Sequence, residues 1–99
     1  MTIRLIFSPA ADEDLTSIFR YYHNVAPHVI PSLEKELNDV IARLKTFPWL
    51  YQLFSLTLRR AHLGHFPFTL YYRANDELVE VAAVLPQQID PAAIEKRLI

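Results

Sequence analysis

The 99-residue chain contains no cysteine, a single glycine and no long apolar run. Without cysteine it can form neither a disulfide framework nor a thiolate metal site, and a small chain of this composition suits a reducing cytoplasm. The apolar run at positions 5–7 is too short for the core of a signal peptide. No segment approaches the length of about 20 apolar residues that crosses a membrane. We therefore expect a cytoplasmic protein without a membrane segment.

Charge of either sign is not in excess, because 10 basic residues stand against 11 acidic ones. This balance argues against a general nucleic-acid binder, which needs a basic excess to neutralise phosphates. The chain also lacks a glycine-rich phosphate loop and a helical H-E-x-x-H pattern, and we expect no cofactor. Apolar residues make up 52% of the sequence. That content and length predict one globular domain, residues 1–99, with a single core.

Three strands are predicted in the second half, at residues 57–63, 66–73 and 78–85, where aromatic and branched side chains are concentrated. Gly64 falls in the first reversal, and we expect it to adopt a positive φ there. The Asn-Asp pair at 75–76 favours the second reversal. The third strand is apolar at both parities apart from Glu80, which is typical of a central strand covered on both faces. The expected arrangement is an antiparallel meander.

The first quarter predicts a short strand followed by a helix. Residues 3–7 read as a strand whose Arg4 lies on an exposed edge. Ser8 can cap the following helix, and Pro9 fits its first helical position. Apolar residues then recur at helical spacing on one side, and the helix is expected to end near positions 23–24.

A second amphipathic helix is expected at residues 27–45, starting at Pro27 or at Pro31, because proline is tolerated in a first turn. Asp39 and Arg43 have the spacing of an ion pair on its outer face. The short link between the two helices implies an antiparallel hairpin laid on the sheet.

The aromatic segment at 47–54 is expected to end the second helix and fold back onto the core, and any of its side chains that stay exposed would form a partner-binding or self-association patch. Asp90 caps a last short helix at 92–99. The predicted fold is α+β: an N-terminal strand, a two-helix antiparallel hairpin packed on an antiparallel sheet of about four strands in the order β-α-α-β-β-β, and a short C-terminal helix.

These elements and their spacing resemble the RelE/ParE superfamily of toxins from bacterial type II toxin–antitoxin modules. The matching stretches are SPAADEDLTSIFRYY, LNDVIARLKTFPWL, LRRAHLGHFPFTLYYRANDELVEVAAVL and the closing Asp-Pro. The Arg-Arg pair followed by Phe-Pro-Phe and Tyr-Tyr-Arg is most similar to the ParE branch, whose members act in plasmid stabilisation. Taken together, these matches cover nearly the whole chain.

The resemblance implies a toxin that a cognate antitoxin protein neutralises. The toxin is expected to form either a homodimer or a toxin–antitoxin hetero-oligomer. In the RelE branch the toxin cuts messenger RNA on the ribosome, whereas in the ParE branch it binds and traps DNA gyrase without hydrolytic chemistry of its own. Relatives often end the last strand with histidine or a basic residue, but this chain has Pro86, Gln87 and Gln88 there. We therefore expect gyrase inhibition first, ribosome-dependent endonuclease activity second and a non-toxic antitoxin-binding relative third.

RNA cleavage requires groups that take and give protons and cations that stabilise phosphate charge. If the chain is a ribonuclease, the candidate catalytic residues are Arg59, Arg60, Tyr72 and Arg73, with arginines on the phosphate and tyrosine as a weak acid or a stacking platform. The predicted partner-binding residues are these four together with three aromatic residues of the preceding segment: Trp49, Tyr51 and Phe54.

Each candidate also has a structural interpretation. Arg59 and Arg60 are neighbours in a strand and must point to opposite faces. Either one of them is functional, or one is solvated while the other pairs with a helix acid such as Glu36. Tyr71 and Tyr72 alternate in the same way, so one is expected in the core and one on the surface. The histidines near Gly64 lack converging ligands, and we expect no metal site.

Overall fold

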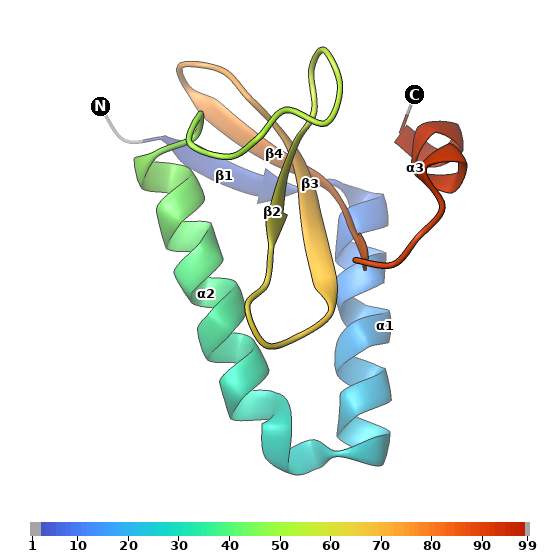
Figure 1. Cartoon of the computed structure of the whole chain (residues 1–99). Helices are drawn as coiled ribbons and strands as arrows, with labels where there is room; N and C mark the ends of the chain where they lie inside the picture. The colour runs from blue at the N-terminus through green and yellow to red at the C-terminus, as the bar shows by residue number, and fades with distance from the viewer. Residues whose placement is uncertain (1–2, 99) are drawn as a thin grey trace.

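The computed structural model describes residues 3–98, and it confirms the predicted α+β fold (Figure 1). A helix hairpin packs on one face of a four-stranded sheet, and a short terminal helix packs on the other. The elements in chain order are β1 (Arg4–Phe7), α1 (Pro9–Val25), the 3-10 turn η1 (Pro27–Val29), α2 (Ile30–Thr46), β2 (Arg59–His62), β3 (Phe68–Ala74), β4 (Leu78–Pro86) and α3 (Pro91–Leu98). None of the helices within this range has the length and apolar character needed to cross a membrane.

The sheet has the strand order β1-β4-β3-β2, which places β4 between two neighbours. The prediction of a central third strand is therefore confirmed, and β2, β3 and β4 form the expected antiparallel meander. The prediction of a fully antiparallel sheet is wrong at one pairing, because β1 runs parallel to β4. A parallel pair needs a long crossover between its strands, and the helix hairpin and the meander supply that connection. Side-chain alternation is the same in both directions, so the sequence pattern did not reveal it.

The reversal between β2 and β3 differs from the expected tight turn. β2 is shorter than the strand predicted at residues 57–63, and its connection to β3 occupies residues 63–67. No residue within 3–98 has a positive φ, so the prediction for Gly64 is wrong. A connection of this length can reverse the chain direction without any residue in the left-handed conformation. A Cβ added at Gly64 would lie 3.9 Å from the Glu36 carboxylate, an ordinary contact distance.

The start of α1 follows the sequence signals. The Ser8 Oγ accepts a hydrogen bond from the Ala11 N–H at 3.1 Å, and Pro9 occupies the first turn. The helix ends at Val25, slightly later than predicted. These features confirm the capping signature that the Ser-Pro pair predicts.

The second helix, α2, begins just before Pro31 and carries a different ion pair from the predicted one. The Lys35 Nζ lies 3.0 Å from the Asp39 carboxylate. Arg43 instead donates from its Nε to the Tyr51 hydroxyl at 2.9 Å. Positions four residues before and after Asp39 are equally close on a helix surface, and the Tyr51 hydroxyl gives Arg43 a separate acceptor.

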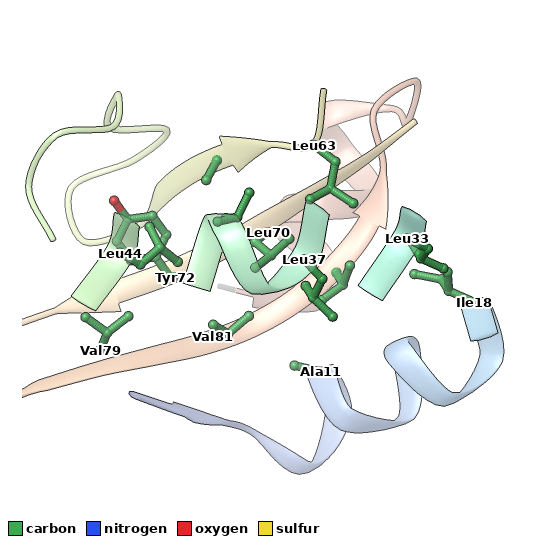
Figure 2. Close-up of a cluster of buried hydrophobic side chains, with 13 residues drawn as sticks. Ala11, Ile18, Leu33, Leu37, Leu44, Leu63, Leu70, Tyr72, Val79 and Val81 are labelled. Atoms are coloured by element: carbon green, nitrogen blue, oxygen red, sulfur yellow. The ribbon is translucent and has the colours of Figure 1, made fainter. Parts of the chain in front are cut away.

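The main core fills the space between the helix hairpin and the sheet (Figure 2). Its largest fully buried members include Leu33, Leu44, Leu70 and Tyr72. A smaller cluster on the opposite face joins β3 and β4 to Ile94 of α3. The prediction that one of the two tyrosines lies on the surface is wrong, because Tyr72 belongs to the first cluster and Tyr71 to the second. The sheet is covered on both faces, so alternation directs one tyrosine into each core.

A single carboxylate ties α1, β4 and α3 together. The Asp14 Oδ2 accepts the Val84 N–H at 2.9 Å and an Arg97 Nη2–H at 2.7 Å. Only 16% of the Asp14 side chain is exposed. From the sequence alone, Asp12, Glu13 and Asp14 are predicted to be solvated charges that complement the dipole at the start of the helix, and this prediction is wrong for Asp14. The Asp90 side chain caps α3 as predicted, accepting from the Ala92 N–H at 2.9 Å.

We expect Asp14→Ala to lower the free energy of unfolding by about 1–3 kcal/mol, because it leaves the buried Val84 N–H without its acceptor. Urea denaturation followed by circular dichroism measures this change. Glu13 is the matched control, since it is exposed in the same turn, and Glu13→Ala should stay within about 0.5 kcal/mol of wild type. Equal stability of the two variants would show that Asp14 does not hold these elements together.

Candidate partner-binding site

The α2–β2 loop, residues 47–58, lies along the outer edge of β2. Leu53 forms an isolated antiparallel bridge with Arg59. The Gln52 carbonyl accepts the Arg60 N–H at 3.1 Å, and the Phe54 N–H donates to the Leu58 carbonyl at 2.7 Å. The first bond satisfies a backbone group of β2 that an edge strand would otherwise leave open, and the second closes a turn within the loop. The loop is therefore fixed to the sheet by its backbone.

Arg59 fixes the same loop through its side chain. Its Nη1 donates to the Tyr51 carbonyl at 2.7 Å and to the Trp49 carbonyl at 3.2 Å. The predicted alternative of a pair with Glu36 is wrong for both adjacent arginines. A loop without regular structure has carbonyl groups that need donors, and a guanidinium supplies several from one position. Arg59 thus has a structural role that its position in a strand did not reveal.

Tyr72 is fully buried beneath this loop and donates its hydroxyl proton to the Pro48 carbonyl at 2.9 Å. Its ring meets the Tyr51 ring edge-on, with centroids 6.5 Å apart. Burial raises the pKa of Tyr72 to about 12, and the opposing effect of the Arg59 charge is smaller. A buried ring cannot stack on a nucleotide base, and this hydroxyl does not titrate near neutral pH.

Arg60 lies on the opposite face of the sheet from Arg59, as predicted. It pairs in register with Tyr71, whereas Arg59 pairs with Tyr72. The Arg60 guanidinium lies over the Phe54 ring, 5.6 Å from its centroid, and Phe54 in turn packs 5.5 Å from the Tyr71 ring. Arg60, Phe54 and Tyr71 thus stack on one another at the border of the second core.

Arg73 also lies on that second face and reaches the C-terminal end of α3. Its Nη2 donates to the Leu98 carbonyl at 3.1 Å. A cation at this position complements the negative end of the helix dipole. Of the three predicted arginines, Arg73 and Arg59 line a common cleft with Trp49, while Arg60 lies outside it.

Several apolar side chains of the loop remain in solvent, so the prediction of core packing holds for only part of the segment. Tyr51 and Phe54 are half-buried against the two cores and confirm it. Pro48 and Leu58 are buried, whereas five further apolar side chains are exposed, and Leu56 reaches 98%. A patch of this kind on a small soluble chain is typical of an interaction surface. Its exposed members are Phe47, Trp49, Leu50, Leu53 and Leu56.

Glu36 holds the β2–β3 connection to α2, a role the sequence analysis missed. Its carboxylate accepts from the His65 N–H at 2.7 Å, the His65 Nδ1 at 2.8 Å and the Phe66 N–H at 3.2 Å. Partial burial raises the pKa of Glu36, but the hydrogen bonds from His65 and Phe66 outweigh this effect and hold that pKa below its usual value. Within residues 3–98, no three His, Asp or Glu side chains converge as metal ligands.

The end of β4 carries neither a cation nor a group that titrates near neutral pH. Pro86 ends the strand, and the Gln87 Nε2 donates to the Leu63 carbonyl at 3.1 Å and the Phe68 carbonyl at 3.2 Å. Gln87 therefore links the two ends of the β2–β3 connection. His62, the last residue of β2, also lies at this end of the sheet, and its Nδ1 is 2.6 Å from the Thr69 hydroxyl oxygen.

Comparison with known proteins agrees with this architecture. A family model described as the ParE toxin of the type II toxin–antitoxin system, parDE, matches residues 5–91. Toxin ParE2 of Mycobacterium tuberculosis, in strains CDC 1551 / Oshkosh and H37Rv, is 28% identical over 99 residues, covering 99% of this chain and 94% of the relative.

Two solved structures are similar in fold. The chromosomal ParDE toxin–antitoxin system from P. aeruginosa superposes with a TM-score of 0.72 and 15% identity, over 85% of this chain and 95% of that one. The YoeB dimer from Staphylococcus aureus gives a TM-score of 0.57 and 19% identity, over 84% and 94% of the two chains. At these identities the structures support the fold alone.

Proposed function

The chain belongs to the ParE toxin family of type II toxin–antitoxin systems, and from this premise we propose that it acts by binding and inhibiting DNA gyrase. A cognate antitoxin protein neutralises it. Because gyrase and the antitoxin are both cytoplasmic, the toxin acts in the cytoplasm. In the resting cell it is bound in a toxin–antitoxin hetero-oligomer. The toxin itself contributes a binding surface and no hydrolytic step.

The observation that carries this proposal is the engagement of the nuclease candidates in the fold. General acid–base catalysis works best with a group whose pKa lies near the working pH. Tyr72 has a pKa of about 12 and donates its proton to the Pro48 carbonyl. The Arg59 Nη1 donates hydrogen bonds to two loop carbonyls. Tyr72 is therefore unsuited to general acid catalysis near neutral pH, and the Nη1 of Arg59 is engaged in holding the loop.

The exposed apolar patch of the α2–β2 loop supports a binding mode of action. Its five members belong to a loop whose backbone is bonded to β2 and to the Arg59 side chain. A loop backbone that is already fixed loses less conformational entropy on binding than a mobile one. We assign this surface, together with the arginines at its border, to protein partners.

Expression of the chain alone in a bacterial host, under a tight promoter, tests the proposal. We expect growth arrest and induction of a DNA-damage reporter while messenger RNA stays intact. Tyr72→Phe keeps the ring and removes only the hydroxyl, and it should remain toxic. Messenger RNA that is cleaved by wild type and spared by Tyr72→Phe would instead identify a ribosome-dependent nuclease. Normal growth with retained antitoxin binding would identify a non-toxic relative.

A further inference from the structure

A cleft opens at the end of the β2–β3 ladder. The first residue of β2, Arg59, pairs with Tyr72, but β3 continues to Ala74 without a partner on that side. The exposed part of the α2–β2 loop borders the gap, and the resulting cleft has a volume of about 430 Å³. Its principal lining residues are Trp49, Leu53, Leu56, Arg59, Arg73 and Ala74.

The backbone of β3 is open to this cleft at Ala74. Hydrogen-bonded pairs alternate along an antiparallel ladder. The Asn75 N–H donates to the Leu78 carbonyl at 3.0 Å, so residue 75 faces β4. Ala74 must then direct its N–H and C=O to the other side, where β2 is missing. An extended segment laid in the cleft can pair with these groups as an added strand.

The side chains around this edge combine apolar surface with positive charge. Trp49 and Leu53 are each 49% exposed, and Leu56 is almost wholly so. The cations are Arg59 and Arg73, and no lining residue of the cleft is acidic. Neither arginine forms an ion pair with a carboxylate of residues 3–98. The site therefore fits a segment that carries an apolar side chain and a carboxylate close together.

We propose that this cleft binds an extended, acidic and apolar segment of the cognate antitoxin, which pairs with the β3 edge at Ala74. The identity of the partner rests on the proposed function, whereas the location and chemistry rest on the cleft. The antitoxin fits better than a second copy of this chain, because a two-fold interface centred here would bring the same arginines of both copies together. The apolar lining and the net charge of −1 disfavour nucleic acid.

Trp49 is the only tryptophan of the chain, so its fluorescence reports on the cleft directly. The probe is the full-length antitoxin encoded beside this chain, with any tryptophan replaced by phenylalanine. On titration we expect the Trp49 emission to shift to shorter wavelength and to become protected from acrylamide quenching. An unchanged Trp49 signal on formation of the complex would overturn the proposal.

Variants then test the chemistry. We expect Arg73→Glu and Leu56→Asp each to weaken antitoxin binding by about 10- to 100-fold, measured by isothermal titration calorimetry. Arg20→Glu, an exposed cation of α1, and Val25→Asp, an exposed apolar residue at the end of α1, are the matched controls and should bind as wild type does. An Asp or Glu of the antitoxin changed to Arg should restore affinity for Arg73→Glu. Equal binding by cleft and control variants would contradict the proposal.

Two further measurements separate this inference from the proposed function. Gyrase inhibition by the wild-type chain is measured without antitoxin, so its failure would reject the gyrase proposal while leaving the binding result intact. A Trp49 shift that depends on toxin concentration in the absence of antitoxin, accompanied by dimers in light scattering, would place a second copy in the cleft and overturn the inference.

Discussion

Replacing Tyr72 by alanine should lower the free energy of unfolding by about 3–5 kcal/mol, which is the range for removal of a buried aromatic side chain. Tyr72 is among the largest fully buried side chains of the main core. The change opens a cavity beneath the α2–β2 loop and removes the donor to the Pro48 carbonyl. Both effects act on the same region, so the loop should loosen together with the core.

Chemical denaturation followed by circular dichroism measures the loss, and two variants control it. Tyr72→Phe keeps the packing and loses only the hydroxyl, with an expected cost of about 1–2 kcal/mol. Tyr21 is 59% exposed on α1, and Tyr21→Ala should cost less than about 1 kcal/mol. If Tyr72→Ala were as stable as Tyr21→Ala, Tyr72 would not be the anchor described here.

Stability should fall steeply in alkaline solution, because the folded state keeps Tyr72 protonated. The pKa of Tyr72 rises from 10.0 to about 12 on burial, so between these values the folded chain binds a proton that the unfolded chain has released. The contribution is therefore fully present below pH 10 and disappears as the pH rises through about 12. At about 1.4 kcal/mol per pKa unit, the loss is about 2–3 kcal/mol. Burial raises the pKa of Tyr22 and of Tyr71 in the same direction.

Urea denaturation at a series of pH values from 8 upward measures the slope, and ultraviolet absorbance follows tyrosinate formation in the folded chain. Tyr72→Phe is the control, since it keeps the fold without the titrating hydroxyl, and its stability should fall less over the same range. An identical slope for wild type and Tyr72→Phe would mean that another group produces the pH dependence.

Much of the fold could be predicted because its signals are local. The Ser8-Pro9 cap, the apolar stripes of both helices and the two-sided apolar character of β4 each depend on neighbouring residues. The direction of β1 could not be predicted, since it depends on which strand it meets across the whole chain. The conformation of Gly64 was wrong for a related reason: the Glu36 carboxylate, 28 positions away, shapes that connection.

The roles of the site residues were harder to predict than their places. Alternation correctly separated Arg59 from Arg60, but their partners lie in a loop without periodic pattern. Tyr71 and Tyr72 alternate as expected, yet both are buried because α3 and Phe54 cover the second face. Such contacts arise only when segments distant in sequence meet. The one available signal was the excess of apolar residues in the loop, which predicts core packing first and a binding patch only for those side chains that stay exposed.

The proposal that the chain acts by binding gyrase, without nuclease chemistry of its own, is tested most directly with purified components. The wild-type chain is added to gyrase with supercoiled DNA and, in parallel, to ribosomes translating a labelled messenger RNA. We predict that cleaved DNA accumulates with gyrase and that the messenger RNA stays intact. Intact DNA together with messenger RNA cut on the ribosome would contradict the account.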